Sequence, residues 1–234
     1  MTRAKAFTFY GAGVPGVNLA DLKGKLIVLE GPDASGRSTQ IAMLTDWLER
    51  RGHAVELVGL KRSTLVSEEL AKAKEGNILS PRTLSLFYAT DFADQLENRI
   101  LPALRAGFIV LADRYIYTLM ARDIVRGADL RWLQSVYSIA LVPDLVMYLR
   151  VAPQRLIERY IYPGRELDYW ESGMDIGYSH SWYDSFIRYQ TELHRSFMRL
   201  QSIYGFVPVN GARSPRTVTR ELQTRIEAVL GPPA

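Results

Sequence analysis

The feature that most constrains this chain is a glycine-bounded octapeptide between an apolar run and an amphipathic stretch. Its sequence, Gly31-Pro-Asp-Ala-Ser-Gly-Arg-Ser38, matches the phosphate-loop pattern of a glycine, four residues and Gly-Lys-[Ser/Thr], except that Arg37 replaces the lysine. The run 25–30 before it is dense in branched apolar residues and predicts a buried strand, and apolar residues recur at helical spacing over 38–51. The two glycines allow consecutive N–H groups to turn inward. The stretch therefore predicts a strand–loop–helix unit that holds a polyphosphate at a helix N-terminus.

The same alternation of short apolar runs and helical stretches continues along the chain. Further strands are predicted over 54–58, 107–112, 144–149 and, at a sheet edge because Pro208 cannot donate to a ladder, 205–209. Helices are predicted over 66–74, 81–105 (possibly bent), 116–126, 129–141 and 215–230. Strands that alternate with helices pair in parallel through right-handed crossovers. We therefore expect an α/β fold of the P-loop NTPase type, a three-layer sandwich with about five parallel strands flanked by helices.

Two segments do not fit this alternation. Residues 1–23 are rich in glycine and short on periodicity, and they are predicted to form an N-terminal extension outside the sheet. The remaining residues, 24–234, are predicted to form the phosphate-loop domain. Between Arg159 and Ser181 the sequence shows neither the helical nor the strand period. Because long loops in compact domains are often lids, we predict a lid-like insert around 160–180.

Composition excludes several classes of protein. The residues are 47% hydrophobic and 23% charged, as in folded domains, and no apolar run is long enough for a transmembrane helix. The absence of cysteine excludes disulfides, thiolate metal sites and cysteine nucleophiles. The 29 basic and 25 acidic residues are dispersed, so nucleic-acid binding is not expected. The N-terminus lacks the apolar core of a signal peptide, and we expect a cytoplasmic protein without membrane contact.

Three motifs resemble the thymidylate kinase family of nucleoside monophosphate kinases. Residues 23–40 are similar to that family's opening, including an acidic residue inside the loop, here Asp33. Residues 112–115, Ala-Asp-Arg-Tyr, resemble its Asp-Arg-[Tyr/Phe/Ser] motif, and residues 86–104 resemble its aromatic-x-x-Asp-Arg helix, with Phe92 in place of the arginine. The resemblance implies a magnesium-dependent kinase that moves the γ-phosphate of ATP to dTMP, and a homodimer.

The resemblance and the physics of the loop together suggest roles on the donor side. Ser38 is expected to bind Mg²⁺ directly and Asp113 to hold the metal through water. The residues expected at the transferred phosphoryl group are Arg37, Asp33 and Arg114, with Arg159 and Arg165 from the lid region. The residues expected to bind ATP are Gly31, Pro32, Asp33, Ala34, Ser35, Gly36, Arg37, Ser38 and Thr39.

The acceptor side departs further from the family pattern. Phe92 lacks the guanidinium that reads the base in the family, residues 59–64 replace its Thr-Arg-Glu-Pro, and residues 116–123 replace small and polar residues. Two alternatives therefore stay open, a kinase with a different nucleotide or small phosphate acceptor, and a non-catalytic nucleotide-binding protein suggested by Arg37. The residues expected to bind the acceptor are Lys61, Arg62, Tyr88, Asp91, Arg114 and Tyr115.

Overall fold

The computed structural model describes residues 6–60, 62–63, 65–66, 68–69, 72, 79–161 and 167–231. At its centre is a five-stranded, all-parallel sheet in the order β2-β3-β1-β4-β5, which confirms the predicted fold class. Pro208 lies on the edge strand β5, where its missing N–H is tolerated. The strands are β1 Lys25–Glu30, β2 Val55–Gly59, β3 Ile109–Asp113, β4 Leu145–Arg150 and β5 Val207–Asn210.

Helices cover both faces of this sheet. They are α1 Arg37–Arg50, α3 Pro81–Gln95, α4 Leu101–Arg105, α5 Ile116–Val125, α6 Leu130–Val136, α7 Pro153–Ile161, α8 Trp182–Tyr204 and α9 Pro215–Leu230. A π-helical turn, Leu96–Ile100, joins α3 to α4, so the predicted helix 81–105 is one irregular rod. Within the described part of the chain, no helix combines the length and the apolar character that crossing a bilayer requires.

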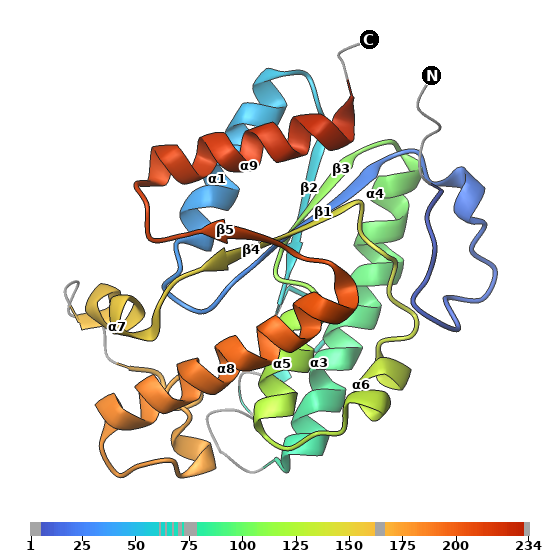
Figure 1. Ribbon diagram of the computed structural model, residues 1–234. Coiled ribbons are helices and arrows are strands. Elements are labelled where there is room, and N and C mark those ends of the chain that lie inside the picture. Colours follow the sequence, from blue (N-terminus) through green and yellow to red (C-terminus); the bar gives the residue numbers. More distant parts are fainter. Residues whose placement is uncertain are drawn as a thin grey trace.

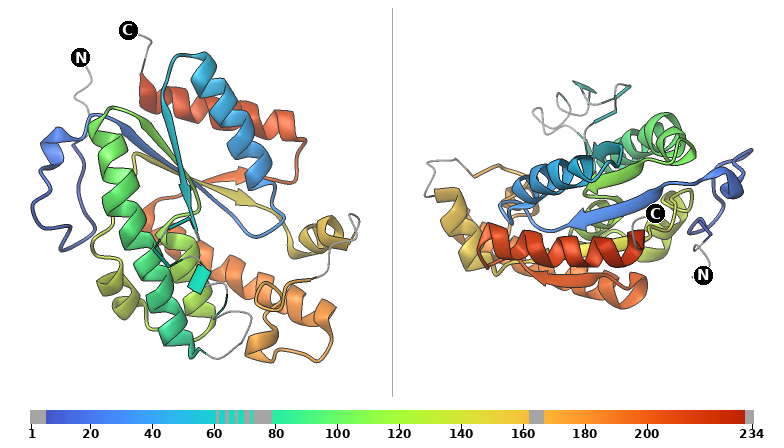
Figure 2. Two further views of the ribbon diagram at one scale, coloured as in Figure 1. Left: turned by 180° about the vertical axis from the view of Figure 1, so that it is seen from behind. Right: turned by 90° about the horizontal axis from the view of Figure 1, so that it is seen from above.

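The three layers follow from the alternation of side chains along the strands. In β1, Leu26 and Val28 pack against α3, α5 and α8, while Ile27 and Leu29 pack against α1 and α9. Figures 1 and 2 show α1 and α9 on one face of the sheet and α3, α5 and α8 on the other. The carboxyl ends of the parallel strands meet at one edge, where such sheets bind ligands.

One predicted helix is shorter in the structure, another lies partly outside the described residues, and two helices were not predicted. The helix predicted over 129–141 ends at Val136, because Tyr137 and Leu141 turn into the core. The helix predicted over 66–74 lies partly outside the described residues. The unpredicted helices are α7 and α8. The region predicted as a lid-like insert contains the end of α7, and its described residues from 167 to 181 form turns and a short 3-10 helix, Met174–Ile176.

The described part of the N-terminal segment, residues 6–22, runs beside residues 138–142 and joins none of the five strands. Two backbone hydrogen bonds connect the two stretches: Tyr10 N donates to Ala140 O at 2.9 Å, and Val142 N donates to Thr8 O at 2.8 Å. The Tyr10 hydroxyl lies 2.5 Å from the Tyr117 hydroxyl of α5. The segment therefore contacts the helix layer that contains α5.

Candidate active site

The octapeptide forms a turn between β1 and α1, at the carboxyl edge of the sheet. Gly31 and Gly36 have φ values of +154° and +94°, which residues with a Cβ rarely adopt. A Cβ at Gly31 would also lie only 3.1 Å from Leu149 O. Gly36 is the N-cap of α1, and no side chain of the described residues caps this helix. The first N–H groups of α1 therefore point toward the loop as donors for an anion.

Arg37 fills the inside of this turn. Its Nε donates to Asp113 Oδ1 at 2.9 Å, and its Nη1 donates to the carbonyl oxygens of Gly31 and Pro32. Its Nη2 lies 3.7 Å from Asp33 Oδ1, and the residue is only 6% exposed. The guanidinium thus connects the start of the loop to the end of β3 through a planar fork.

A cluster of arginines surrounds Asp33. Arg114 and Arg122 both form ion pairs with its carboxylate, and Arg122 Nη2 donates to Asp33 Oδ2 at 2.7 Å. Arg114 has a φ of +73°, and its buried Nε donates to no acceptor among the described residues. Burial, and then the nearby charge of Arg122, lower the pKa of Arg114 to about 10. Together with Arg37, the cluster places three guanidinium groups around the carboxylates of Asp33 and Asp113.

Glu30 fixes the backbone that carries Arg114. Its carboxylate is fully buried and accepts hydrogen bonds from Tyr115 N at 2.9 Å, from Thr118 N at 3.3 Å and from the Thr118 hydroxyl. The carboxylate therefore caps the N-terminus of α5 from the neighbouring strand. Burial raises the pKa of Glu30 to about 7, although the hydrogen bonds from Thr118 and Tyr115 act in the opposite direction.

The predicted donor-side residues that the structure describes lie around the loop. In the parallel pairing of β1 and β3, Leu29 is opposite Asp113, which places the Asp113 carboxylate beside the loop. Arg159 of α7 donates to the carbonyl oxygens of Ala34 and Ser35 at 3.2 and 3.1 Å. Arg165 lies outside the described residues.

The predicted acceptor residues separate into two groups. Tyr88 lines a small pocket beside the arginine cluster, together with Leu84, Leu119, Arg122, Asp123, Arg126, Trp170 and Tyr189. Tyr115 is only 2% exposed and donates its hydroxyl to Leu141 O at 3.1 Å, so its ring lies in the core. Phe92 also lies in the core, where its ring meets that of Tyr115 edge-on at 5.1 Å.

Asp91 and its neighbour Gln95 anchor the loop after β2. Asp91 Oδ1 accepts from Ser63 N at 3.0 Å, and Gln95 hydrogen-bonds both the N–H and the carbonyl of Gly59. Asp91 therefore acts on this loop, in which Arg62 is exposed. Lys61, which was predicted from the same loop, lies outside the described residues.

Sequence reasoning missed two arginines as site residues, Arg122 of α5 and Arg126 at the C-cap of that helix. Arg126 binds both carboxylate oxygens of Asp175, at 2.7 and 3.0 Å, and lies between the rings of Trp170 and Tyr189. Arg126 therefore links the described part of the predicted lid region to the end of α5. The signal in the sequence is the spacing of Thr118 and Arg122, which lie four residues apart on one face of α5, with Arg126 four residues further on at its C-cap.

The residues at this edge fit a magnesium ion that is held mainly by phosphate and water. Ser38 is exposed at the start of α1 and Asp113 presents a carboxylate beside the loop. The described residues contain no group of three or more acidic or histidine side chains placed to bind a metal. Magnesium typically binds through one or two protein oxygens together with phosphates and waters, which agrees with this donor set.

Comparisons with known proteins identify the family that this chain resembles. The family model for thymidylate kinase matches residues 29–172. The chain is 36% identical to a probable thymidylate kinase 2 of Saccharolobus solfataricus, over 90% of this chain and 97% of that protein. It is 36% identical to a probable thymidylate kinase of Pyrococcus horikoshii and 32% identical to a thymidylate kinase of Thermoanaerobacter sp.. These two matches each cover 59% of this chain, and 70% and 71% of the respective relative. Because the family model spans more than half of the sequence and the first relative aligns over nearly its whole length, the chain belongs to the thymidylate kinase family.

Proposed function

We propose that the chain transfers the γ-phosphate of ATP to dTMP, giving ADP and dTDP. The observation that carries this proposal is the cluster of Arg37, Arg114 and Arg122 on Asp33, directly beside an uncapped helix N-terminus. Phosphoryl transfer needs in-line positioning and neutralisation of charge, and requires little covalent chemistry from the protein. Family membership supports the nucleotide substrates.

On the donor side, the backbone of residues 31–39 would bind the ATP phosphates. Arg37 stabilises the conformation of the loop by donating to two of the loop's carbonyl oxygens, and Arg159 of α7 donates to two others. Ser38 and, through water, Asp113 would hold magnesium, which when bound neutralises charge on the phosphate oxygens. Arg114, with an unpartnered Nε among the described residues, would bind the transferred phosphoryl group.

On the acceptor side, Tyr88 lies at the pocket where the base is expected. The loop after β2 would bring Arg62 toward the acceptor phosphate, with Asp91 and Gln95 holding that loop in place. Phe92 favours a second candidate, a kinase for another nucleoside monophosphate. This buried side chain stands where the family that the sequence resembles has the arginine that reads the base.

A screen of deoxy- and ribonucleoside monophosphates with ATP and magnesium tests both candidates. The diphosphate of each acceptor nucleoside is measured by chromatography, so that ATP hydrolysis is not counted as transfer. For AMP, whose product is also the product of hydrolysis, the consumption of AMP is measured instead. We expect dTMP to give the highest kcat/KM. A higher value for another monophosphate would favour the second candidate, and absence of any diphosphate product would contradict the kinase assignment.

We also propose that the protein is a homodimer, which the family resemblance implies. Sedimentation equilibrium gives the mass directly, with twice the 26.5 kDa of one chain expected. A species that remains at the mass of one chain at all concentrations would contradict the dimer.

A further inference from the structure

Arginines of α5 and of the residues that flank this helix contact the phosphate loop and the predicted lid region. Arg114, which precedes α5, and Arg122, within it, both pair with Asp33 of the loop. Arg126, the C-cap of α5, pairs with Asp175 of the predicted lid region. Arg122 therefore lies on the face of α5 that is turned toward the loop.

The arginine cluster contains a buried donor that has no acceptor among the described residues. Three guanidinium groups, from Arg37, Arg114 and Arg122, share the carboxylates of Asp33 and Asp113. The buried Nε of Arg114 has no acceptor among the described residues. Buried donors are normally paired, so the cluster favours an additional anion with several acceptor oxygens. A phosphate group has this chemistry.

Arg122 also contacts the small pocket beside the arginine cluster. It lines the pocket that also contains Tyr88, Trp170 and Tyr189, and within the described chain Arg37 and Arg114 are not part of that lining. A ligand with a phosphate at one end and a planar base at the other would therefore pass Arg122. A nucleoside monophosphate is such a ligand.

We propose that Arg122 binds the acceptor, exchanging its ion pair with Asp33 for the phosphate end of the nucleoside monophosphate. This inference rests on the proposed function and adds a substrate-binding residue to it. Asp33 remains neutralised after the exchange, because Arg37 and Arg114 stay beside it. A dianionic phosphate accepts two parallel hydrogen bonds from the fork of Arg122 and carries more charge than the shared carboxylate.

The first test compares the kinetics of the wild type with those of Arg122→Gln and Arg122→Lys. Removal of a hydrogen bond to a charged group should raise the KM for dTMP at least about tenfold in Arg122→Gln. The KM for ATP should stay within about twofold, because the guanidinium of Arg122 is assigned to the acceptor phosphate. Arg122→Lys should fall between the two proteins, since it keeps the charge but loses the fork.

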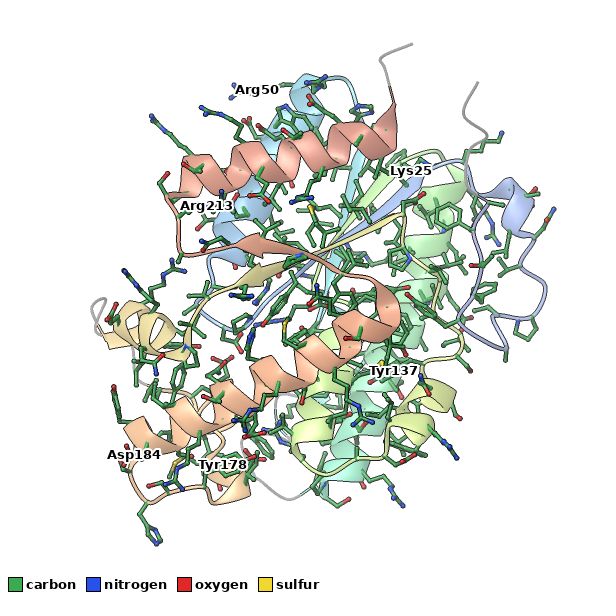
Figure 3. All side chains as sticks on the ribbon, in the orientation of Figure 1. Lys25, Arg50, Tyr137, Tyr178, Asp184 and Arg213 are labelled. Atoms are coloured by element: carbon green, nitrogen blue, oxygen red, sulfur yellow. The ribbon has the colours of Figure 1, made fainter. Side chains whose placement is uncertain are left out.

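The matched control is Arg50→Gln, which removes an arginine from an exposed ion pair with Asp46 in α1. Figure 3 shows Arg50 at the outer end of α1, on the other side of the sheet from α5. Both KM values should be unchanged in this variant.

A second test separates binding of the acceptor from support of Asp33. If Arg122 only holds Asp33 in place, Arg122→Gln will have no further effect once Asp33 has been replaced by asparagine. We expect a further rise in the KM for dTMP, again at least about tenfold, in the Asp33→Asn background. The absence of this further rise, or an unchanged KM in the single variant, would overturn the inference.

Circular dichroism establishes that each variant is folded, and Arg122→Lys carries the test if Arg122→Gln is not. The wild type is measured first. If the wild type forms no dTDP, the proposed function fails. If the wild type is active and Arg122→Gln matches it, only the inference about Arg122 fails.

Discussion

At the scale of single residues, Arg37 makes contacts that a lysine cannot make together. The guanidinium of Arg37 donates hydrogen bonds to Asp113 and to two loop carbonyl oxygens, and it also lies near Asp33. The ammonium of a lysine is one compact group of donors and cannot reach all of these partners together. We expect Arg37→Lys to lower the free energy of unfolding by about 1–3 kcal/mol, because a buried partner loses its hydrogen bond. Urea denaturation measures this loss, with Arg50→Lys as the exposed control. Equal or greater stability of Arg37→Lys would contradict the assigned contacts.

Glu30 gives the stability a dependence on pH that has the opposite sign to that of a salt-bridged carboxylate. Folding raises the pKa of Glu30 from 4.5 to about 7, chiefly through burial. Between these pH values the folded chain keeps a proton that the unfolded chain has released. The contribution of Glu30 to stability therefore falls as pH rises from about 4.5 to about 7, and is constant above that range.

The variant Glu30→Gln isolates this effect, because an amide keeps the shape and an acceptor for Tyr115 N but does not titrate. Relative to the wild type, Glu30→Gln should become more stable as pH rises from 5 to 7. Urea denaturation at half-unit steps of pH gives the difference between the two proteins, in which other titrating groups cancel. A difference that does not change with pH would show that Glu30 keeps an ordinary pKa.

At the scale of elements, local patterns predicted the parts of the site that are contiguous in sequence. The loop 31–38 could be assigned because a strand, two glycines and a helix follow one another without interruption. The helix α8 was not predicted, although Phe186, Tyr189 and Leu193 recur at helical spacing, because it directly follows residues 160–181, which have no period. The ion pair of Arg122 with Asp33 joins residues 89 positions apart, and only the packing of α5 against the loop brings them together.

Arg126 at the C-cap of α5 holds the segment 167–177, which Ser185 and Gln190 of α8 also contact, so the order of this segment should depend in part on the arginine. Arg126 binds Asp175, the Trp170 carbonyl and the Tyr189 hydroxyl. The Asp175→Asn variant removes the charge from a pair in which both side chains are at most 10% exposed. We expect backbone amides of 168–177 to exchange with solvent at least about tenfold faster, because local opening becomes easier.

Hydrogen exchange followed by mass spectrometry measures that rate for individual peptides. The control is Asp184→Asn in the first turn of α8, which Figure 3 shows near Tyr178 at the end of the molecule opposite α9. Exchange in 168–177 should match the wild type in this control. If Asp175→Asn also leaves exchange there unchanged, Arg126 is not what orders the segment.

At the scale of the whole molecule, ligands that bind the folded chain should raise its melting temperature by mass action. A ligand at about 100 times its Kd stabilises the folded state by about 2.7 kcal/mol. We expect ATP with magnesium to raise the melting temperature, and Gly36→Val to abolish that rise, because a β-branched residue is strained at a φ of +94°. Gly16→Val is the control, since Gly16 also has a positive φ but lies far from the loop in sequence, in the N-terminal segment. A rise retained in Gly36→Val would place ATP elsewhere.

We expect the N-terminal segment to unfold together with the α/β domain, because Tyr10 packs against it. Tyr10 meets the rings of Tyr117 and Tyr204 edge-on and shares a hydrogen bond with Tyr117. Removing this half-buried ring in Tyr10→Ala should lower the free energy of unfolding by about 1–3 kcal/mol, and Tyr10→Phe by about 1 kcal/mol. Urea denaturation followed by circular dichroism reports the unfolding of the helices and strands. If the segment is loosely attached, the urea midpoints of Tyr10→Ala and Tyr10→Phe will equal that of the wild type, because the segment is then not part of the cooperative unit. A lower free energy of unfolding in Tyr10→Ala would instead show that residues 6–22 stabilise the layer that contains α5, the helix that carries Arg122.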